Sequence, residues 1–156
     1  FVTWNEPGYG LDATPSAKRA FTSWLKEHYQ TIDKMNDELG TLFKSFSDVE
    51  IPFSPESNRA YWFLWVSYNQ QAFADLFTRQ RMIFKKHAPK ANLSGKHPVQ
   101  VLHGDALYCN DIIAQDATQD VFGCDAYNGS LFSYRDSMEA ARSLNSKGPV
   151  ISYETH

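Results

Sequence analysis

Four short strand-like segments alternate with helix patterns along this 156-residue chain, and this alternation most constrains its fold. The strand candidates are an opening segment that ends at Asn5 and Glu6, then residues 91–96, 120–127 and 150–154. A second apolar segment, residues 98–103, is either a strand or an extended loop over the site. Strands that alternate with helices require crossover connections, which favours a parallel sheet and an α/β fold.

The helix patterns cover residues 14–30, 31–40, 56–87, 105–117 and 131–146. Thr14 followed by Pro15 is typical of a helix start, and Gly40 is typical of a helix end. In the long central pattern we expect a core stripe of Tyr61, Trp65, Tyr68, Ala72, Leu76, Ile83 and Phe84, reinforced by Leu64, Phe73 and Phe77.

Four strands in 156 residues make half of a (β/α)8 TIM barrel, which typically needs about 250 residues. The alternative is a small open doubly wound sheet, which usually binds phosphates through a glycine-rich first turn. Here the first turn carries a carboxylate, which counts against phosphate binding. We therefore expect residues 1–156 to form a single domain, the C-terminal half of a catalytic barrel. Because the chain begins and ends on strands, we expect it to be a fragment.

Composition narrows the classes of function. A net charge of −3 gives no electrostatic footprint for nucleic acid or an anionic membrane, and no segment approaches the apolar run of a transmembrane helix. Aromatic residues make up 15% of the chain, which suits a ring-rich core or a sugar-binding groove. The compartment stays open, with the cytoplasm as the default. We expect Cys109 and Cys124 to be buried free thiols, although a disulfide stays open.

Every predicted strand ends in polar or ionisable residues, and the carboxyl ends of parallel barrel strands converge on one active face. These residues are Asn5 and Glu6, Lys96 and His97, Asp125 and Tyr127, and Glu154. Glu6 and Glu154 would face each other across that mouth. Two such carboxyl groups suit a retaining glycosidase, where one donates a proton and the other attacks the anomeric carbon.

The two carboxyl groups need different environments. The nucleophile must stay ionised, so it needs donors such as the Tyr127 hydroxyl. The acid must be protonated near neutral pH, so its pKa must lie well above the ordinary value of about 4.3. A neighbouring carboxylate and partial burial both raise a carboxyl pKa.

Other residues are candidates for substrate contact. Trp4 either lines the sugar subsite or belongs to the core. For Asp125 and Tyr127 we expect a place in the site rather than in the core, because they end a strand on the active face. His156 lies two residues after Glu154, and His103 is a further site-lining candidate. The spacing of His87, His97 and His103 fits no standard metal pair, so we expect solvated or site-lining histidines and neither metal nor cofactor.

The stretch Trp4-Asn5-Glu6-Pro7-Gly8 resembles the acid/base motif on strand 4 of the clan A glycoside hydrolases. The sequence after this motif resembles glycoside hydrolase family 42, the β-galactosidases, in residues 21–26, 29, 31–33, 35–36, 40–41, 43 and 51–52. Residues 120–127 resemble strand 6 of that family, and residues 150–154 stand where strand 7 presents the nucleophile.

The resemblance implies Glu6 as acid/base, Asn5 as the partner that fixes the sugar 2-hydroxyl, and Glu154 as nucleophile. Two features depart from the family: Pro7 stands where many members have Tyr, and residues 8–17 lack the cysteines that bind zinc in several members. The expected function is hydrolysis of terminal β-D-galactosides with retention. The alternatives are a clan A β-glycanase for another β-linked polysaccharide, or a non-catalytic carbohydrate-binding relative. The expected partner is an oligosaccharide or polysaccharide, without nucleic acid or membrane, and a homo-oligomer of the full-length protein stays open.

Overall fold

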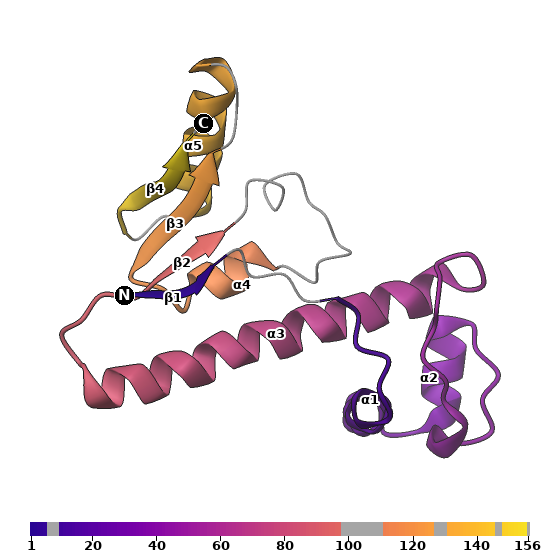
Figure 1. Cartoon of the computed structure of the whole chain (residues 1–156). Coiled ribbons are helices and arrows are strands. Elements are labelled where there is room, and N and C mark those ends of the chain that lie inside the picture. Colours follow the sequence, from indigo (N-terminus) through magenta and orange to yellow (C-terminus); the bar gives the residue numbers. More distant parts are fainter. Residues whose placement is uncertain (6–9, 98–110, 127–130, 146–147, 156) are drawn as a thin grey trace. The chain divides into compact units, whose positions relative to one another are not determined.

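A computed structural model of the chain describes residues 1–5, 10–97, 111–126, 131–145 and 148–155 (Figure 1). In chain order its elements are β1 (Val2–Asn5), α1 (Pro15–Tyr29), α2 (Ile32–Leu39), the 3-10 turn η1 (Phe46–Asp48), α3 (Arg59–His87), β2 (Ser94–His97), α4 (Ile112–Asp116), β3 (Val121–Ala126), α5 (Leu131–Leu144) and β4 (Val150–Thr155). Among these described elements, no helix is both long enough and apolar enough to cross a membrane.

The four strands form one parallel sheet in the order β1-β2-β3-β4, so neighbours in sequence are neighbours in space (Figure 1). Helices connect every pair of successive strands. The predicted α/β fold is therefore confirmed, and the architecture is that of part of a (β/α)8 barrel. The second apolar segment, residues 98–103, lies outside the described residues.

Two of the strands each contain one extra residue. In β1 the register passes from Val2 opposite Ser94 to Trp4 opposite Gly95, which leaves Thr3 as the extra residue. In β4 it passes from Ser152 opposite Cys124 to Glu154 opposite Asp125, which leaves Tyr153 as the extra residue. These are β-bulges, and each reverses the face on which the following side chains lie.

The described contacts divide the chain into two compact units. We call residues 1–10 and 70–156 the sheet unit, and Leu11–Asn69 the helical unit. The long helix α3 contributes its first part to the helical unit and its remainder to the sheet unit. The catalytic candidates all belong to the sheet unit.

The helical unit is built as the sequence predicts. The Thr14 side chain caps α1 by accepting a hydrogen bond from the Ala17 amide at 3.3 Å, and Thr31 caps α2 through the Lys34 amide at the same distance. Gly40 ends α2 in the left-handed conformation at φ 63°, where a side chain would be strained. The core is aromatic and aliphatic: Phe21, Leu25, Tyr29, Met35, Leu39, Val49, Ile51, Tyr61 and Trp65.

The predicted core residues of α3 are correct in the first half of the helix and only partly correct in the second, where Phe73 and Phe77 were predicted. Tyr61 and Trp65 are buried, but Ala72, Leu76 and Ile83 are exposed. The buried rings of the second half are Phe73 and Phe77, which pack on Trp4 at centroid distances of 6.3 and 5.7 Å. The reason is geometric: a seven-residue repeat drifts around a straight helix by about 20° per heptad, so one stripe does not stay on one face for 29 residues.

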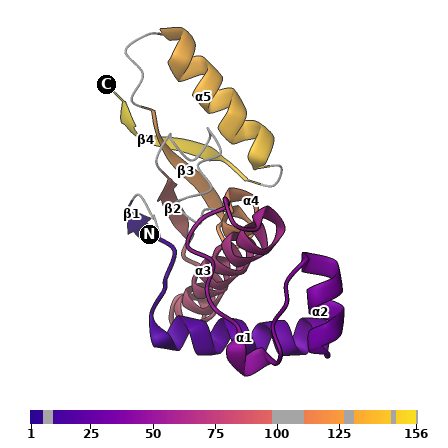
Figure 2. The same ribbon diagram turned by 90° about the vertical axis from the view of Figure 1, so that its right-hand side faces the viewer.

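One face of the sheet is covered by α4 and α5. Phe122 and Cys124 of β3 pack there with Ile112 and Ala141 in a small buried core. Figure 2 shows α5 running alongside β3 and β4. Cys124 is a free thiol and is buried, as predicted, whereas Cys109 lies outside the described residues.

Candidate active site

The ammonium group of Lys96 joins three side chains from the other three strands. Its Nζ donates to Asn5 Oδ1 at 2.9 Å, lies 3.4 Å from Asp125 Oδ2, and donates to Glu154 Oε1 in a short ion pair. We call these four residues the Lys96 cluster. It lies at the carboxyl ends of the strands, which is where active sites of parallel barrels are built.

The face of the sheet on which the cluster lies follows from the register. Lys96 is paired with Asn5 on one side and with Gly123 on the other, while Asp125 is paired with Glu154. Without the two bulges, Asn5 and Glu154 would alternate onto the face that α4 and α5 cover. The extra residues therefore place Asn5 and Glu154 on the same face as Lys96 and Asp125.

Lys96 and Glu154 also lie two strands apart, because β3 runs between β2 and β4. Adjacent strands are about 4.8 Å apart, so the two backbones are separated by about 10 Å. Only two long side chains that extend toward each other can span that distance. The pairing of a lysine with a glutamate meets this requirement, and the shorter Asp125 reaches Lys96 from the strand between them.

Burial strengthens the electrostatics of the cluster. The Asp125 side chain is 0% exposed and that of Lys96 is 10% exposed, whereas Glu154 keeps 42% of its side-chain surface open to solvent. The hydrogen bond to Glu154 is the main reason that the pKa of Lys96 is raised above its ordinary value, so the ammonium stays charged at neutral pH. The exposed carboxylate is thus the one that a substrate can reach.

The structure brings three of the predicted site residues together: Asn5, Asp125 and Glu154. Four others, Glu6, His103, Tyr127 and His156, lie outside the described residues, so their roles stay predictions. Glu6 directly follows Asn5 in the chain, and Tyr127 directly follows the last residue of β3.

Trp4 lies on the other face of β1. Its ring packs on Phe73 and Phe77, and its Nε1 donates to Gln80 Oε1, all on α3. Of the two alternatives for this residue, these contacts favour a place in the core over a place in the sugar subsite.

His97 is neither solvated nor part of the site lining, which corrects the expectation from the sequence. It is 1% exposed and its ring stacks on Phe122 at a centroid distance of 5.2 Å, on the helix-covered face. Neither ring nitrogen has a hydrogen-bond partner among the described residues. Burial lowers the pKa of His97 to about 4, so the ring is neutral at physiological pH.

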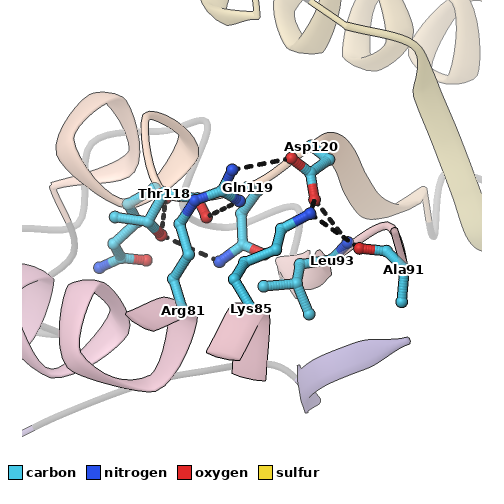
Figure 3. Close-up of polar contacts among 8 residues, drawn as sticks. Arg81, Lys85, Ala91, Leu93, Thr118, Gln119 and Asp120 are labelled. Atoms are coloured by element: carbon cyan, nitrogen blue, oxygen red, sulfur yellow. Dashed lines mark hydrogen bonds and ion pairs between the residues drawn. The ribbon is translucent and has the colours of Figure 1, made fainter. Parts of the chain in front are cut away.

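A second charged cluster lies at the amino ends of the strands (Figure 3). Asp120, just before β3, accepts from Arg81 Nη2 at 2.9 Å, from Lys85 Nζ at 2.7 Å and from the Leu93 amide at 2.9 Å. Arg81 also donates to the Thr118 carbonyl at 2.9 Å. Burial alone would raise the pKa of Asp120, but these hydrogen bonds outweigh it and hold the pKa well below its usual range. This cluster fastens α3 to the sheet, far from the strand ends that carry the candidate site.

Sequence reasoning places Lys96 at a strand end but assigns it no role, and it misses the Asp120 cluster. The signal for Lys96 is its position, level with Asn5 at the end of the next strand. For the Asp120 cluster, the signal is that Arg81 and Lys85 are four residues apart and so share one helix face.

Fold and site together define a barrel protein whose polar groups gather at the carboxyl ends of parallel strands. The chain belongs to glycoside hydrolase family 42, described as beta-galactosidase, because the model of that family matches residues 2–150. Glu154 lies just beyond the matched range. No curated protein sequence matches the chain at the significance required of a relative.

Solved structures share the fold. The chain is similar to an apo exo-carrageenase of family 42 from Bacteroides ovatus, with a TM-score of 0.72 and 19% identity over 94% of this chain and 24% of that one. A beta-galactosidase from Marinomonas ef1 has a TM-score of 0.62 and 20% identity over 75% of this chain and 18% of that one. An agarase has a TM-score of 0.60 and 20% identity over 96% and 20%. The chain therefore spans about a quarter or less of the length of each.

Proposed function

We propose that the protein containing this chain is a retaining glycoside hydrolase that cleaves terminal β-D-galactosides. The observation that carries the proposal is the Lys96 cluster, which gathers Asn5, Asp125 and Glu154 at the carboxyl ends of the strands. Membership of family 42 supports both the reaction class and the sugar.

In the proposed mechanism, Glu154 is the nucleophile. It attacks the anomeric carbon as the glycosidic bond breaks, and a covalent glycosyl-enzyme forms. Glu6 protonates the departing oxygen and then, as a base, takes a proton from the water that releases the sugar. Charge supports this division of roles, because Glu154 is paired with an ammonium and is therefore held in the ionised form that a nucleophile needs.

Asn5 is proposed to bind the sugar 2-hydroxyl. Its side-chain oxygen accepts from Lys96, so the amide NH2 group is the part of the side chain that can donate to a substrate. A hydrogen bond to that hydroxyl strengthens in the transition state and supplies part of the rate acceleration.

A second candidate substrate is a polysaccharide rather than a small galactoside. The observation that favours it is that two of the structural neighbours are named as an exo-carrageenase and an agarase. The same two carboxylates would serve either substrate, because the chemistry at the anomeric carbon is the same.

The test is hydrolysis of nitrophenyl β-galactoside by the full-length protein and by its Glu154→Gln and Glu6→Gln variants. We expect Glu154→Gln to lose at least about a thousandfold in kcat/KM, because no covalent intermediate can form. Proton NMR of the first-released sugar should show the β anomer. Equal rates for wild type and Glu154→Gln, or the α anomer as the first product, would refute the mechanism.

The same proteins are also assayed with agarose and carrageenan oligosaccharides as substrates. Release of reducing ends from them, with no release of nitrophenol from the galactoside, would replace the galactosidase assignment with the polysaccharide one.

A further inference from the structure

We propose that Lys96 is a positioning residue that keeps the Glu154 carboxylate charged and aims it at the substrate. The inference rests on the proposed function, in which Glu154 is the nucleophile. Lys96 itself touches neither the sugar nor the reacting atoms in this proposal, and it acts only through the groups that it holds.

Geometry gives Lys96 this role. Its ammonium has three donors, and the described structure directs them at one oxygen from each of the other strands: Asn5 Oδ1, Asp125 Oδ2 and Glu154 Oε1. A lysine tied to three partners cannot rotate freely, although its stem is flexible. The ammonium holds Glu154 through Oε1, and in the proposed mechanism the other carboxylate oxygen makes the attack.

The electrostatics of the Lys96 cluster support the same role for Lys96. The charged groups beside Glu154 in the described structure include Lys96 on β2, which contacts it, and Asp125 on β3, which lies 3.4 Å from the same ammonium. Asp125 is fully buried and shares the Lys96 ammonium with Glu154. If the ammonium were removed, two carboxylates would remain close together, and each would raise the pKa of the other.

Asn5 links the acid side of the site to the same group. Lys96 fixes the Asn5 side chain at 2.9 Å, and Glu6 is the next residue in the chain. One ammonium therefore tethers the ends of both strands that carry the proposed catalytic pair. A purely structural ion pair would add stability but would leave the protonation of Glu154 irrelevant to turnover, and this difference can be measured.

The first measurement is the pH dependence of kcat/KM for the full-length protein and its Lys96→Met variant, which keeps the length of the stem and removes the charge. We expect the acidic limb, which reports the nucleophile in the free enzyme, to move up by about one pH unit or more. Lys96→Arg keeps the charge and should keep the acidic limb near that of wild type. Lys86→Met, which removes an exposed lysine of α3, is the matched control and should leave the profile unchanged.

A lower rate at every pH with an unmoved acidic limb in Lys96→Met would overturn the proposal, because that is what a structural role predicts. If Lys96→Met does not accumulate as folded protein, Lys96→Gln replaces it in the same comparison.

The second measurement does not depend on activity. Thermal unfolding of Lys96→Met, Glu154→Gln and the double variant forms a double-mutant cycle. We expect the double variant to lose less than the sum of the two single losses, since each single change leaves a charge without its partner. Additive losses would overturn the inference about Lys96. Absence of hydrolysis by the wild type on all the glycosides would instead refute the proposed function, so the two failures are distinguishable.

Discussion

Single residues in this chain are constrained by space as well as by chemistry, and Gly123 is the sharpest case. A Cβ added there would lie 2.2 Å from the Gly95 carbonyl oxygen, 2.2 Å from a ring carbon of Tyr153 and 2.7 Å from Ser94 Oγ. The first of these atoms is backbone in the neighbouring strand and cannot move cheaply. The missing side chain is therefore what gives the Tyr153 ring, next to Glu154, its place on the sheet.

We expect Gly123→Ala to destabilise the protein by about 1–3 kcal/mol, because overpacking forces neighbours off their preferred positions. The midpoint of thermal unfolding checks this. Gly10→Ala is the matched control, since an added Cβ there meets no atom of the described residues within 4 Å, and it should change stability by less than about 0.5 kcal/mol. Equal midpoints for the two variants would show that Tyr153 does not need the space above Gly123.

Among the elements, α3 is attached to the sheet in part by the Asp120 cluster. Asp120→Asn keeps the shape of the side chain but removes the charge that Arg81 and Lys85 share. We expect a loss of about 2 kcal/mol at pH 7, because hydrogen bonds between charged groups in a partly buried site are lost. Chemical denaturation measures the loss. Asp75→Asn on the exposed surface of α3 is the control and should be nearly neutral.

The same cluster predicts a pH dependence. The pKa of Asp120 is lowered in the folded state, so its contribution is fully present above the unfolded pKa of about 4 and is lost as the pH falls further toward the folded pKa. The stability difference between wild type and Asp120→Asn should therefore shrink below about pH 4. A difference that stays constant from pH 7 to pH 3 would contradict this account of the cluster.

The elements also show what sequence reasoning can reach. Caps such as Thr14, Thr31 and Gly40 are local, and so is the alternation of strands with helices, so the boundaries of α1 and α2 and the parallel sheet could be predicted, whereas the helix expected over residues 105–117 begins only at Ile112 in the described structure. The face of the sheet on which Trp4 lies could not be predicted, because a bulge depends on how two strands pair and cannot be recognised in the sequence of one strand. In the second half of α3, Phe73 and Phe77 were predicted to be buried, but Ala72, Leu76 and Ile83 were wrongly placed in the core, since the buried face depends on which surface the helix meets.

The candidate site was predicted in part for the same reasons. Strand-end chemistry identified Asn5, Asp125 and Glu154, because convergence of the strand ends follows from the fold alone. It could not identify Lys96 as their common partner, since that depends on which residue of β2 is level with the ends of its neighbours.

As a whole molecule, the described sheet has two open edges. β1 and β4 each pair with one neighbour in the described sheet. Apolar side chains are exposed on them, Val2 at 47% and Ile151 at 41%, and Phe1, just before β1, is 76% exposed. Unpaired strand edges are templates for pairing with another chain. The solved structures that share the fold are at least four times as long as the part of them that matches.

We therefore expect the 156-residue chain, expressed by itself, to self-associate and to hydrolyse no nitrophenyl β-galactoside. Size-exclusion chromatography with light scattering measures the first property, and the galactoside assay measures the second. The full-length protein is the comparison for both. A monomeric and active 156-residue chain would contradict the half-barrel interpretation.

The two bulges affect how this chain aligns with its relatives. Thr3 and Tyr153 have no residue opposite them, so either could be absent while Asn5 stays opposite Lys96 and Glu154 stays opposite Asp125. A one-residue alignment gap at Thr3 or Tyr153 is therefore compatible with an intact Lys96 cluster. A gap one or two positions away can be shifted onto the bulge.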